Sequence, residues 1–416
     1  LERTYETEVA GVRVRAPMIH IHTVAAGGGS VLHFDGARMR VGPGSAGADP
    51  GPACYGRGGP LAITDCNVVL GKLRPEYFPH SFGPDGDRAL AVSAAVEAFN
   101  RLADSISDAS GTPLDVAAVA SGFLDIAVDN MVNAIKKVSV QRGHDITDYA
   151  LACFGGAGGQ HACLVADRLG ITRVHVHPLA GVLSALGIGL ADVRLVFDQA
   201  VEETLSQACL DRLSPAWEAL EQRGRDGLLE HAVDEGAVSL VRRVALHYAG
   251  SDTTLHVGDG GLDDVVRRFE ATHRARFGFV SPERDLIVES VQVEAIGAAA
   301  RLDLADVTAG GGSRELGSHP TLMAGTWHDT PFLDRAALTP GLEVDGPAVL
   351  VESSATTVIE PGWCGRVLAN GDLILERVVP REQAAAIGTD VDPVQLEIFN
   401  NLFMNIAEQM GVVLEN

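Results

Sequence analysis

The chain has 416 residues, 46% of them apolar and 21% charged, so it can bury a large core and is expected to form two or three domains. Its 55 acidic and 32 basic residues give a formal net charge of -23, which argues against nucleic acid or an anionic membrane as a partner. No apolar run approaches ~20 residues and no secretory leader pattern is present, so a soluble cytoplasmic protein is expected. The six cysteines include no Cys-x-x-Cys pair, which predicts reduced thiols.

Near the start, an apolar run from Met18 leads into Gly27-Gly28-Gly29-Ser30. A strand that ends in such a turn lets backbone amides approach an anion with no Cβ in the way. The pattern predicts a phosphate cradle, although an ordinary tight turn has the same composition. No Gly-Lys-Ser/Thr follows, which excludes a P-loop. His20 and His22 alternate along the run and could bind a metal or simply line a polar sheet surface.

The spacing of apolar residues predicts a hairpin and three helices after this turn. Residues 31–41 alternate about an Asp-Gly turn, which predicts a β-hairpin. Residues 63–73 predict a helix with Asp65 as its cap. Two further helices are expected at about 91–107 and 115–137, and the apolar spacing of the second is typical of a core helix.

A long loop rich in glycine and proline occupies residues 42–60. Long ordered loops inside compact domains are usually functional. Asp49, Cys54 and Arg57 could supply a carboxylate, a thiol and a guanidinium that binds phosphate. In the alternative interpretation Asp49 is a turn residue and Cys54 a small buried apolar group.

A second glycine turn lies further along the chain. Residues 151–154 read as a buried strand, Gly155 to Gly159 as the turn, and the following residues to Leu169 as a helix. The dinucleotide fingerprint fails because His161 stands where glycine is needed for close packing of helix and strand. Free amides and a helix N-terminus both favour phosphate. Two glycine turns in one α/β region therefore predict a nucleotide held between them.

A second pair of alternating histidines, His175 and His177, shares one face of a predicted strand. A pair alone is insufficient for a metal site, and histidines that line a polar sheet surface are the alternative.

Composition and hydrophobic period divide the chain into four predicted regions. The predicted divisions are an α/β region at 1–200, a helical connector at 201–237, a β-rich domain at 238–380, and a linker with an amphipathic helix from Asp392 at 381–416.

Three long motifs occur in an order that resembles the ATP-dependent hydantoinase and oxoprolinase family. They are His22 to Ser30, Ser45 to Tyr55, and Phe154 to Ala162. The tail from Asp392 is similar to the entry into that family's B-type module, and the stretch from Tyr248 to Thr253 is similar to its oxoprolinase branch, in which the A and B modules are fused.

This resemblance implies an actin-like, ribonuclease-H-like ATPase fold for residues 1 to about 200, a β-rich (α+β) domain after it, and then the first helix of the B module. It implies ATP-coupled opening of the lactam 5-oxo-L-proline to glutamate, with ATP and magnesium as cofactors. The expected partners are a small lactam substrate and the rest of the A/B polypeptide, and we expect a homo-oligomer.

Site residues follow from the motifs. Asp49 and Asp65 are the candidate catalytic carboxylates, for metal or water positioning, and His22 is a candidate metal ligand. The candidate nucleotide-binding residues are Gly27, Gly28, Gly29, Ser30, Gly155, Gly156, Gly158 and Gly159.

Two departures from the family pattern bear on activity. The family usually has aspartate where this chain has His20, and a neutral imidazole is a poorer magnesium ligand than a carboxylate. The family's first phosphate motif would precede Leu1, so we expect that this segment alone does not turn over. Alternative functions are an ATP-dependent N-methylhydantoinase or related carboxylase subunit, a non-catalytic nucleotide-binding or assembly subunit, and a plain structural domain pair.

Overall fold

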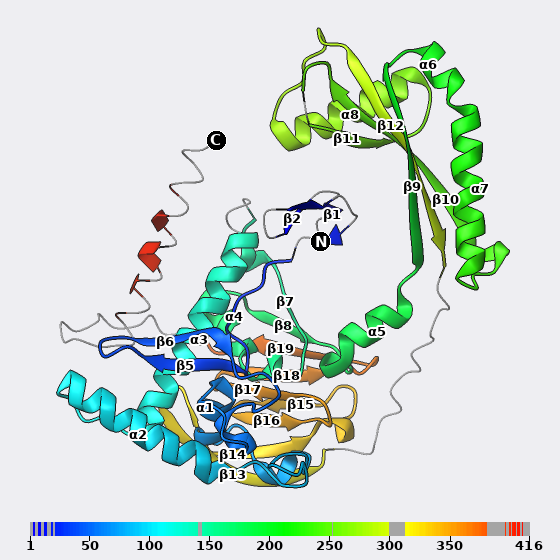
Figure 1. Ribbon diagram of the computed structural model, residues 1–416. Coiled ribbons are helices and arrows are strands. Elements are labelled where there is room, and N and C mark those ends of the chain that lie inside the picture. The colour runs from blue at the N-terminus through cyan, green and yellow to red at the C-terminus, as the bar shows by residue number, and fades with distance from the viewer. Residues whose placement is uncertain are drawn as a thin grey trace. The chain divides into compact units, whose positions relative to one another are not determined.

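The computed structural model describes residues 3–4, 7–9, 12–14, 18–19, 21–139, 144–251, 253–298 and 313–380, and a few positions between 396 and 410. The chain divides into two compact units (Figure 1). The first unit comprises Leu1–Leu183 and Ala305–Asn416, and the second comprises Ser184–Leu304. The first unit is therefore built from two segments that are far apart in the sequence.

Two larger sheets form the centre of the first unit. One has the order β15-β18-β19-β8-β7, in which β7 and β8 are parallel and the other neighbours antiparallel. The other has the order β13-β14-β16-β17. The strands are β7 (Leu151–Cys153), β8 (Arg173–Val176), β13 (Glu315–Met323), β14 (Thr326–Asp334), β15 (Glu343–Asp345), β16 (Ala348–Val351), β17 (Thr356–Ile359), β18 (Trp363–Val367) and β19 (Leu373–Arg377).

The division of the chain differs from the expected boundaries at 200, 237 and 380. Leu375 of β19 pairs with Val174 of β8, so the last strands complete a sheet that begins far earlier, and in Figure 1 the orange β19 lies beside the green β8. The stretch 238–380 is consequently shared between the two units. A period of two predicts strands but does not say which sheet each strand joins.

The helices of the first unit match the predicted ones closely. They are α1 (Ile63–Val69), α2 (Val92–Ser110), α3 (Val116–Val138) and α4 (Ala162–Leu169). The predicted cap is misplaced by three positions, because the N-cap of α1 is Ala62 and Asp65 stands in the first turn. By length and composition α3 could cross a membrane, but its apolar residues, such as Phe123 and Ile126, are buried in the core of this unit.

The predicted hairpin forms and packs on these helices. It consists of β5 (Ser30–Phe34) and β6 (Met39–Ser45), and the Asp35 carboxylate accepts from the backbone N–H groups of Ala37 and Arg38 in the turn. Buried side chains of the hairpin, α1, α2 and α3 share one core cluster. The hairpin thereby fixes the glycine turn that precedes it. The short strands before this turn are β1 (Arg3–Thr4), β2 (Thr7–Val9), β3 (Val12–Val14) and β4 (Met18–Ile19).

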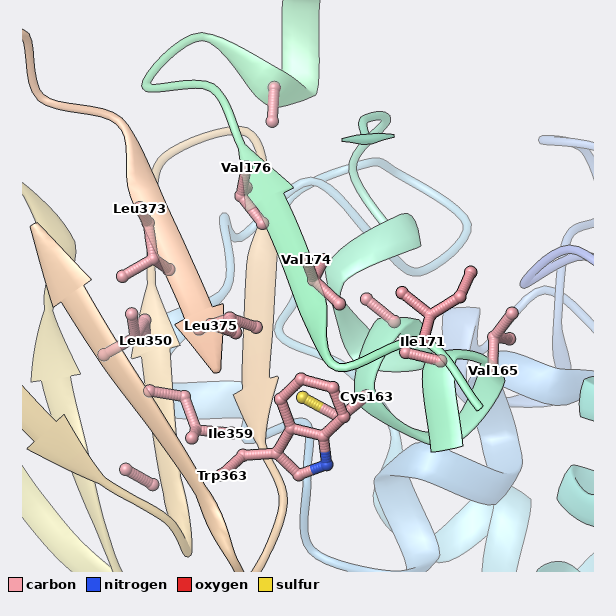
Figure 2. Packing of buried hydrophobic residues seen from close by; sticks show 14 of the residues in the cluster. Cys163, Val165, Ile171, Val174, Val176, Leu350, Ile359, Trp363, Leu373 and Leu375 are labelled. Carbon is pink, nitrogen blue, oxygen red and sulfur yellow. The ribbon is translucent and has the colours of Figure 1, made fainter. Parts of the chain in front are cut away.

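A second core cluster joins the first sheet to α4. Figure 2 shows the indole of Trp363 among apolar side chains of β8, β19 and α4. Trp363, Val174 and Leu375 are fully buried. Burial of such side chains stabilises a fold by roughly 1.5–3 kcal/mol each, so the late strands are firmly attached to the early ones.

The second unit is a four-stranded antiparallel sheet with helices packed on it. Its sheet has the order β11-β10-β12-β9. Trp217 of the expected connector packs in the core with Phe269 and Val291, so the connector belongs to this unit. The elements are α5 (Leu183–Leu190), which starts at the unit boundary, β9 (Val193–Thr204), α6 (Gln207–Arg212), α7 (Ser214–Glu230), β10 (Val238–Tyr248), β11 (Leu255–Gly258), α8 (Leu262–Phe277) and β12 (Leu286–Gly297).

Most of the helix expected from Asp392 lies outside the described residues. Its described positions are helical, and their apolar side chains, Phe403 among them, are exposed.

Candidate functional site

The first glycine turn is tied to α1 and to the loop after β6. The N–H of Ser30 donates to the carbonyl of Gly27 at 2.9 Å and closes the turn. The carbonyl of Gly28 accepts from both the N–H and the hydroxyl of Thr64, at 2.8 and 3.0 Å. A Cβ on Gly28 would lie 2.8 Å from the Thr64 hydroxyl oxygen, whereas one on Gly27 would meet nothing within 4 Å. Packing therefore requires glycine at position 28, and the open side of the turn is at Gly27.

The second glycine turn connects β7 to the short 3-10 helix Gly158–Gln160 that precedes α4. Gly155 has φ +92, a left-handed conformation that favours glycine. A Cβ on Gly156 would lie 2.9 Å from the Ser354 carbonyl oxygen, and one on Gly159 would lie 2.6 Å from the Thr357 hydroxyl oxygen. This turn therefore packs directly against β17 and the turn that precedes it.

The structure brings the two glycine turns together. A Cβ built on Gly28 would be 3.7 Å from the Cβ of Ala157, in the second turn. The helix α1 contacts both turns, because Thr64 binds the first and the Asn67 amide donates to the Gln160 side chain at 2.8 Å. The predicted juxtaposition of the two glycine stretches is thus present in the fold.

Asp65, a predicted catalytic carboxylate, is fully buried and holds the glycine-rich loop. One carboxylate oxygen accepts from the N–H of Cys54 at 2.7 Å, and the other accepts from the N–H groups of Ala53 and Ala62 at 3.1 and 2.8 Å. Burial raises its pKa, while these hydrogen bonds oppose the change. Both oxygens are engaged by backbone donors, which gives Asp65 a positioning role in this conformation.

Two other candidates in the glycine-rich loop, Arg57 and Cys54, have structural roles in this conformation. Arg57 donates to the carbonyls of Gly83, Ala48 and Ser81, so its guanidinium fixes the loop instead of presenting a fork to phosphate. Cys54 is buried, and burial raises the pKa of its thiol far above the usual range.

Asp49 stays exposed in a turn beside the first glycine turn. That turn begins at Gly47, whose backbone nitrogen would lie 4.0 Å from a Cβ on Gly29. Asp49 is therefore the predicted carboxylate that remains accessible near the glycine turns.

The second predicted histidine pair, His175 and His177, does not form a metal site with other described residues. His175 pairs with Asp372 at 3.0 Å, and the ring of His177 accepts from the N–H of Leu179 at 3.0 Å. No group of three or more His, Cys, Asp or Glu side chains in the described part of the chain is placed to hold a metal ion. His22 is exposed, and His20 lies outside the described residues.

A buried polar cluster behind the second glycine turn escaped the sequence analysis. Lys72 and Glu360 form an ion pair at 2.6 Å with both side chains almost fully buried. His161 is also buried, and neither of its ring nitrogens has a hydrogen-bond partner among the described residues. Burial, with a smaller contribution from Lys72, lowers the pKa of His161 to about 3, so its imidazole is neutral. A lysine inside the apolar stretch after α1 was the available signal for such a cluster.

A pocket of about 370 Å³ opens beside the second glycine turn. It lies between α3, β7, α4 and the segment that contains His22, and Gly158 and His161 are among its lining residues. The pocket lining is mostly apolar, which is typical of sites for small molecules.

Comparison with known proteins identifies related sequences. The sequence pattern described as hydantoinase/oxoprolinase matches residues 1–196, and that of the hydantoinase/oxoprolinase C-terminal domain matches residues 199–370. The chain is 38% identical to 5-oxoprolinase 1 of Arabidopsis thaliana over 427 residues, which cover 100% of this chain and 34% of that protein. The chain thus spans about a third of the length of the curated relatives it matches.

Two solved structures have a similar fold. The ATP-dependent caprolactamase from Pseudomonas jessenii gives a TM-score of 0.68 at 26% identity, over 90% of this chain and 55% of that one. The nucleotide-free structure of acetone carboxylase gives a TM-score of 0.76 at 21% identity, over 91% of this chain and 55% of that one. The similarity to acetone carboxylase, at 21% identity, supports a common fold alone.

Proposed function

Because the chain belongs to the hydantoinase/oxoprolinase family, we propose that it forms the ATP-binding part of an ATP-dependent cyclic amidase that opens 5-oxo-L-proline to L-glutamate. The observation that carries this proposal is the juxtaposition of the two glycine turns on the common support of α1. In the proposed arrangement the phosphates of ATP lie at Gly27 to Ser30 and Gly155 to Gly159. The rest of a longer A/B polypeptide completes the enzyme.

Several features support a nucleotide at this place. The open side of Gly27 leaves room for an anion next to the backbone, and the second turn leads through a 3-10 helix into the N-terminus of α4. We assign an actin-like ATPase lobe to the first unit, on the basis of the family and of these two turns. Local amides must hold the phosphates against a chain of net charge -23.

The chemistry explains why ATP is needed. An amide is a poor electrophile, and transfer of the γ-phosphoryl group of ATP to the amide oxygen, with loss of ADP, activates its carbon. Water then adds to that carbon and the C–N bond breaks, which leaves an acyl phosphate and a free amine. A second water releases phosphate and gives the carboxylate. Positioning and electrostatic stabilisation supply most of the catalysis in phosphoryl transfer, which suits a site built from fixed turns.

The described residues do not fit a protein-bound metal centre, because they hold no group of three candidate ligands. Magnesium commonly binds through one or two carboxylates and the phosphates themselves. We therefore propose that magnesium accompanies ATP and that exposed Asp49 orients it or its water. Asp65 acts by holding the loop, and no step is assigned to His22 as a metal ligand.

A second candidate function is hydrolysis of an uncharged cyclic amide, a class that includes N-methylhydantoin and caprolactam. The described lining of the pocket contains no Lys or Arg to bind a substrate carboxylate, which favours a ring that has no carboxylate. A third candidate, a nucleotide-binding assembly subunit, would bind ATP without catalysis. Binding of ATP alone does not separate the third candidate from the first two, but turnover by the full-length enzyme does.

Calorimetric titration of magnesium-ATP into the chain tests the nucleotide site. Gly27→Val places a side chain in the open side of the turn without meeting a neighbour, so it should fold normally and weaken binding about tenfold or more. Gly44→Val is the matched control, since a Cβ there also meets nothing within 4 Å, and it should bind like the wild type. Absence of binding in the folded wild type, or unchanged binding by Gly27→Val, would overturn the assignment.

A further inference from the structure

The turn between β16 and β17 lies directly against the second glycine turn. We call residues 352–355 the serine turn, after Ser353 and Ser354. The carbonyl oxygen of Ser354 would lie 2.9 Å from a Cβ on Gly156 and 2.4 Å from a Cβ on Gly181. The serine turn therefore approaches the second glycine turn more closely than any residue with a side chain would allow.

Hydrogen bonds fix the serine turn in this position. The N–H of Glu352 donates to the carbonyl of Ala355 at 3.0 Å and closes the turn. Directly after it, the N–H of Thr356 donates to the carbonyl of Gly156 at 3.2 Å. The two turns are thus joined through their backbones, so groups on one have a defined position relative to groups on the other.

The serine hydroxyls are available to a ligand. Ser353 and Ser354 are both exposed, whereas Ala355 and Thr356 after them are buried. Neither hydroxyl forms a hydrogen bond with the residues that the structure describes. A serine hydroxyl carries one O–H donor. Two adjacent donors therefore lie at the surface, on the border of the second glycine turn.

The glycine turns present unused backbone donors beside these hydroxyls. The N–H groups of Gly156 and Ala157 donate to no described residue, and neither do those of Gly28 and Gly29. The two pairs are close, since a Cβ on Gly28 would lie 3.7 Å from the Cβ of Ala157. Successive backbone N–H groups in a turn can bind one anion together. A phosphate chain is the type of ligand that such a set of donors favours.

The acidic residue of the serine turn does not oppose an anion there. The side chain of Glu352 is 10% exposed, and its carboxylate lies 3.9 Å from the guanidinium of Arg335. Its charge is therefore buried beside a cation, while the neutral hydroxyls of the turn remain at the surface.

We propose that Ser353 and Ser354 bind the phosphate chain of the nucleotide, with their hydroxyls as donors beside the amides of the second glycine turn. The inference rests on the proposed function, since it adds a third turn to the same nucleotide site. The sequence motifs placed that site within residues 1 to about 200, whereas the serine turn belongs to the second segment of the first unit. Nucleotide binding then requires both segments of that unit.

The test removes both hydroxyls and measures the affinity for two ligands. The double variant Ser353→Ala with Ser354→Ala is titrated calorimetrically with magnesium-ATP and with magnesium tripolyphosphate, which carries the phosphate chain without the nucleoside. Loss of hydrogen bonds to charged phosphate should weaken the binding of both ligands about tenfold or more. The variant should fold normally because both side chains are exposed, and urea unfolding checks this.

A matched control removes two exposed hydroxyls elsewhere. Ser93→Ala with Ser105→Ala makes the same chemical change on the exposed side of α2. This control should bind both ligands like the wild type.

The inference is overturned if the double variant at Ser353 and Ser354 binds both ligands as tightly as the wild type. It is also overturned if only the affinity for ATP falls, because the serines would then contact the nucleoside. A wild type that binds ATP but not tripolyphosphate would overturn it as well, since the phosphate chain would then have no site of its own.

Gly27→Val, measured beside these variants, keeps the two proposals apart. If Gly27→Val weakens ATP binding and the serine double variant does not, the serine turn alone is rejected. If only the serine double variant weakens binding, the serine turn is retained and the assignment at the first glycine turn is rejected. If the folded wild type binds neither ligand, the nucleotide site and the inference are both rejected.

Discussion

The side-chain amide of Asn67 donates to the side-chain oxygen of Gln160 across 2.8 Å, in the buried interior of the first unit. Asn67 lies on α1 and Gln160 at the end of the second glycine turn. Since Thr64 of the same helix binds the first glycine turn, this hydrogen bond completes a continuous connection between the two turns. The relative position of the turns therefore depends on a bond between residues 93 positions apart.

We expect Asn67→Ala to lower the free energy of unfolding by about 1–3 kcal/mol, because it leaves the Gln160 oxygen buried without its partner. Urea unfolding measures the loss. A double-mutant cycle with Gln160→Ala should give a coupling energy of roughly 0.5–3 kcal/mol. Additive effects of the two substitutions would mean that the hydrogen bond contributes nothing specific.

The buried ion pair between Lys72 and Glu360 should be sensitive to the loss of one partner. Lys72→Met leaves a buried carboxylate without its cation, which costs about 3–5 kcal/mol. The double variant Lys72→Met with Glu360→Leu removes both charges and should recover most of that loss. If Lys72→Met unfolds at the wild-type urea concentration, the pair is not formed in solution.

Local patterns predicted local structure well. The helices expected at 91–107 and 115–137 are present as α2 and α3, because apolar spacing and caps such as Asp115 act within a few residues. The pairing of β19 with β8 and the contact of Lys72 with Glu360 could not be predicted, since they join residues about 200 or more positions apart.

The candidate site shows the same limit. The sequence shows both glycine turns. Their proximity followed from the prediction that both bind one nucleotide. The sequence identified Asp65 as a chemically notable carboxylate, but only the folded loop supplies the three N–H groups that it accepts from. His161 entered the sequence analysis only as a mismatch to a glycine fingerprint, and the local pattern reveals neither its burial nor the effect on its pKa of Lys72, which is distant in the sequence.

Substitution of Asp65 should loosen the glycine-rich loop. In Asp65→Asn one acceptor oxygen becomes an amide that faces backbone N–H donors, so at least one hydrogen bond to a charged group is lost, at a cost of about 1.5–3 kcal/mol. Hydrogen exchange of the Ala53, Cys54 and Ala62 amides should accelerate. Exposed Asp49→Asn serves as the control and should leave these amides protected. Unchanged exchange in Asp65→Asn would contradict the positioning role.

Acid should destabilise the chain partly through His161. In the unfolded chain this imidazole binds a proton below about pH 6.5, whereas burial lowers the folded pKa to about 3. Between these values the unfolded state binds more protons, so the free energy of unfolding falls as the pH falls. At pH 5 the contribution is on the order of 2 kcal/mol. Urea unfolding at pH 7 and pH 5 should show a smaller loss for His161→Phe than for wild type, while exposed His231→Phe should match wild type. Equal losses in all three proteins would mean that His161 is solvated or paired in the native state.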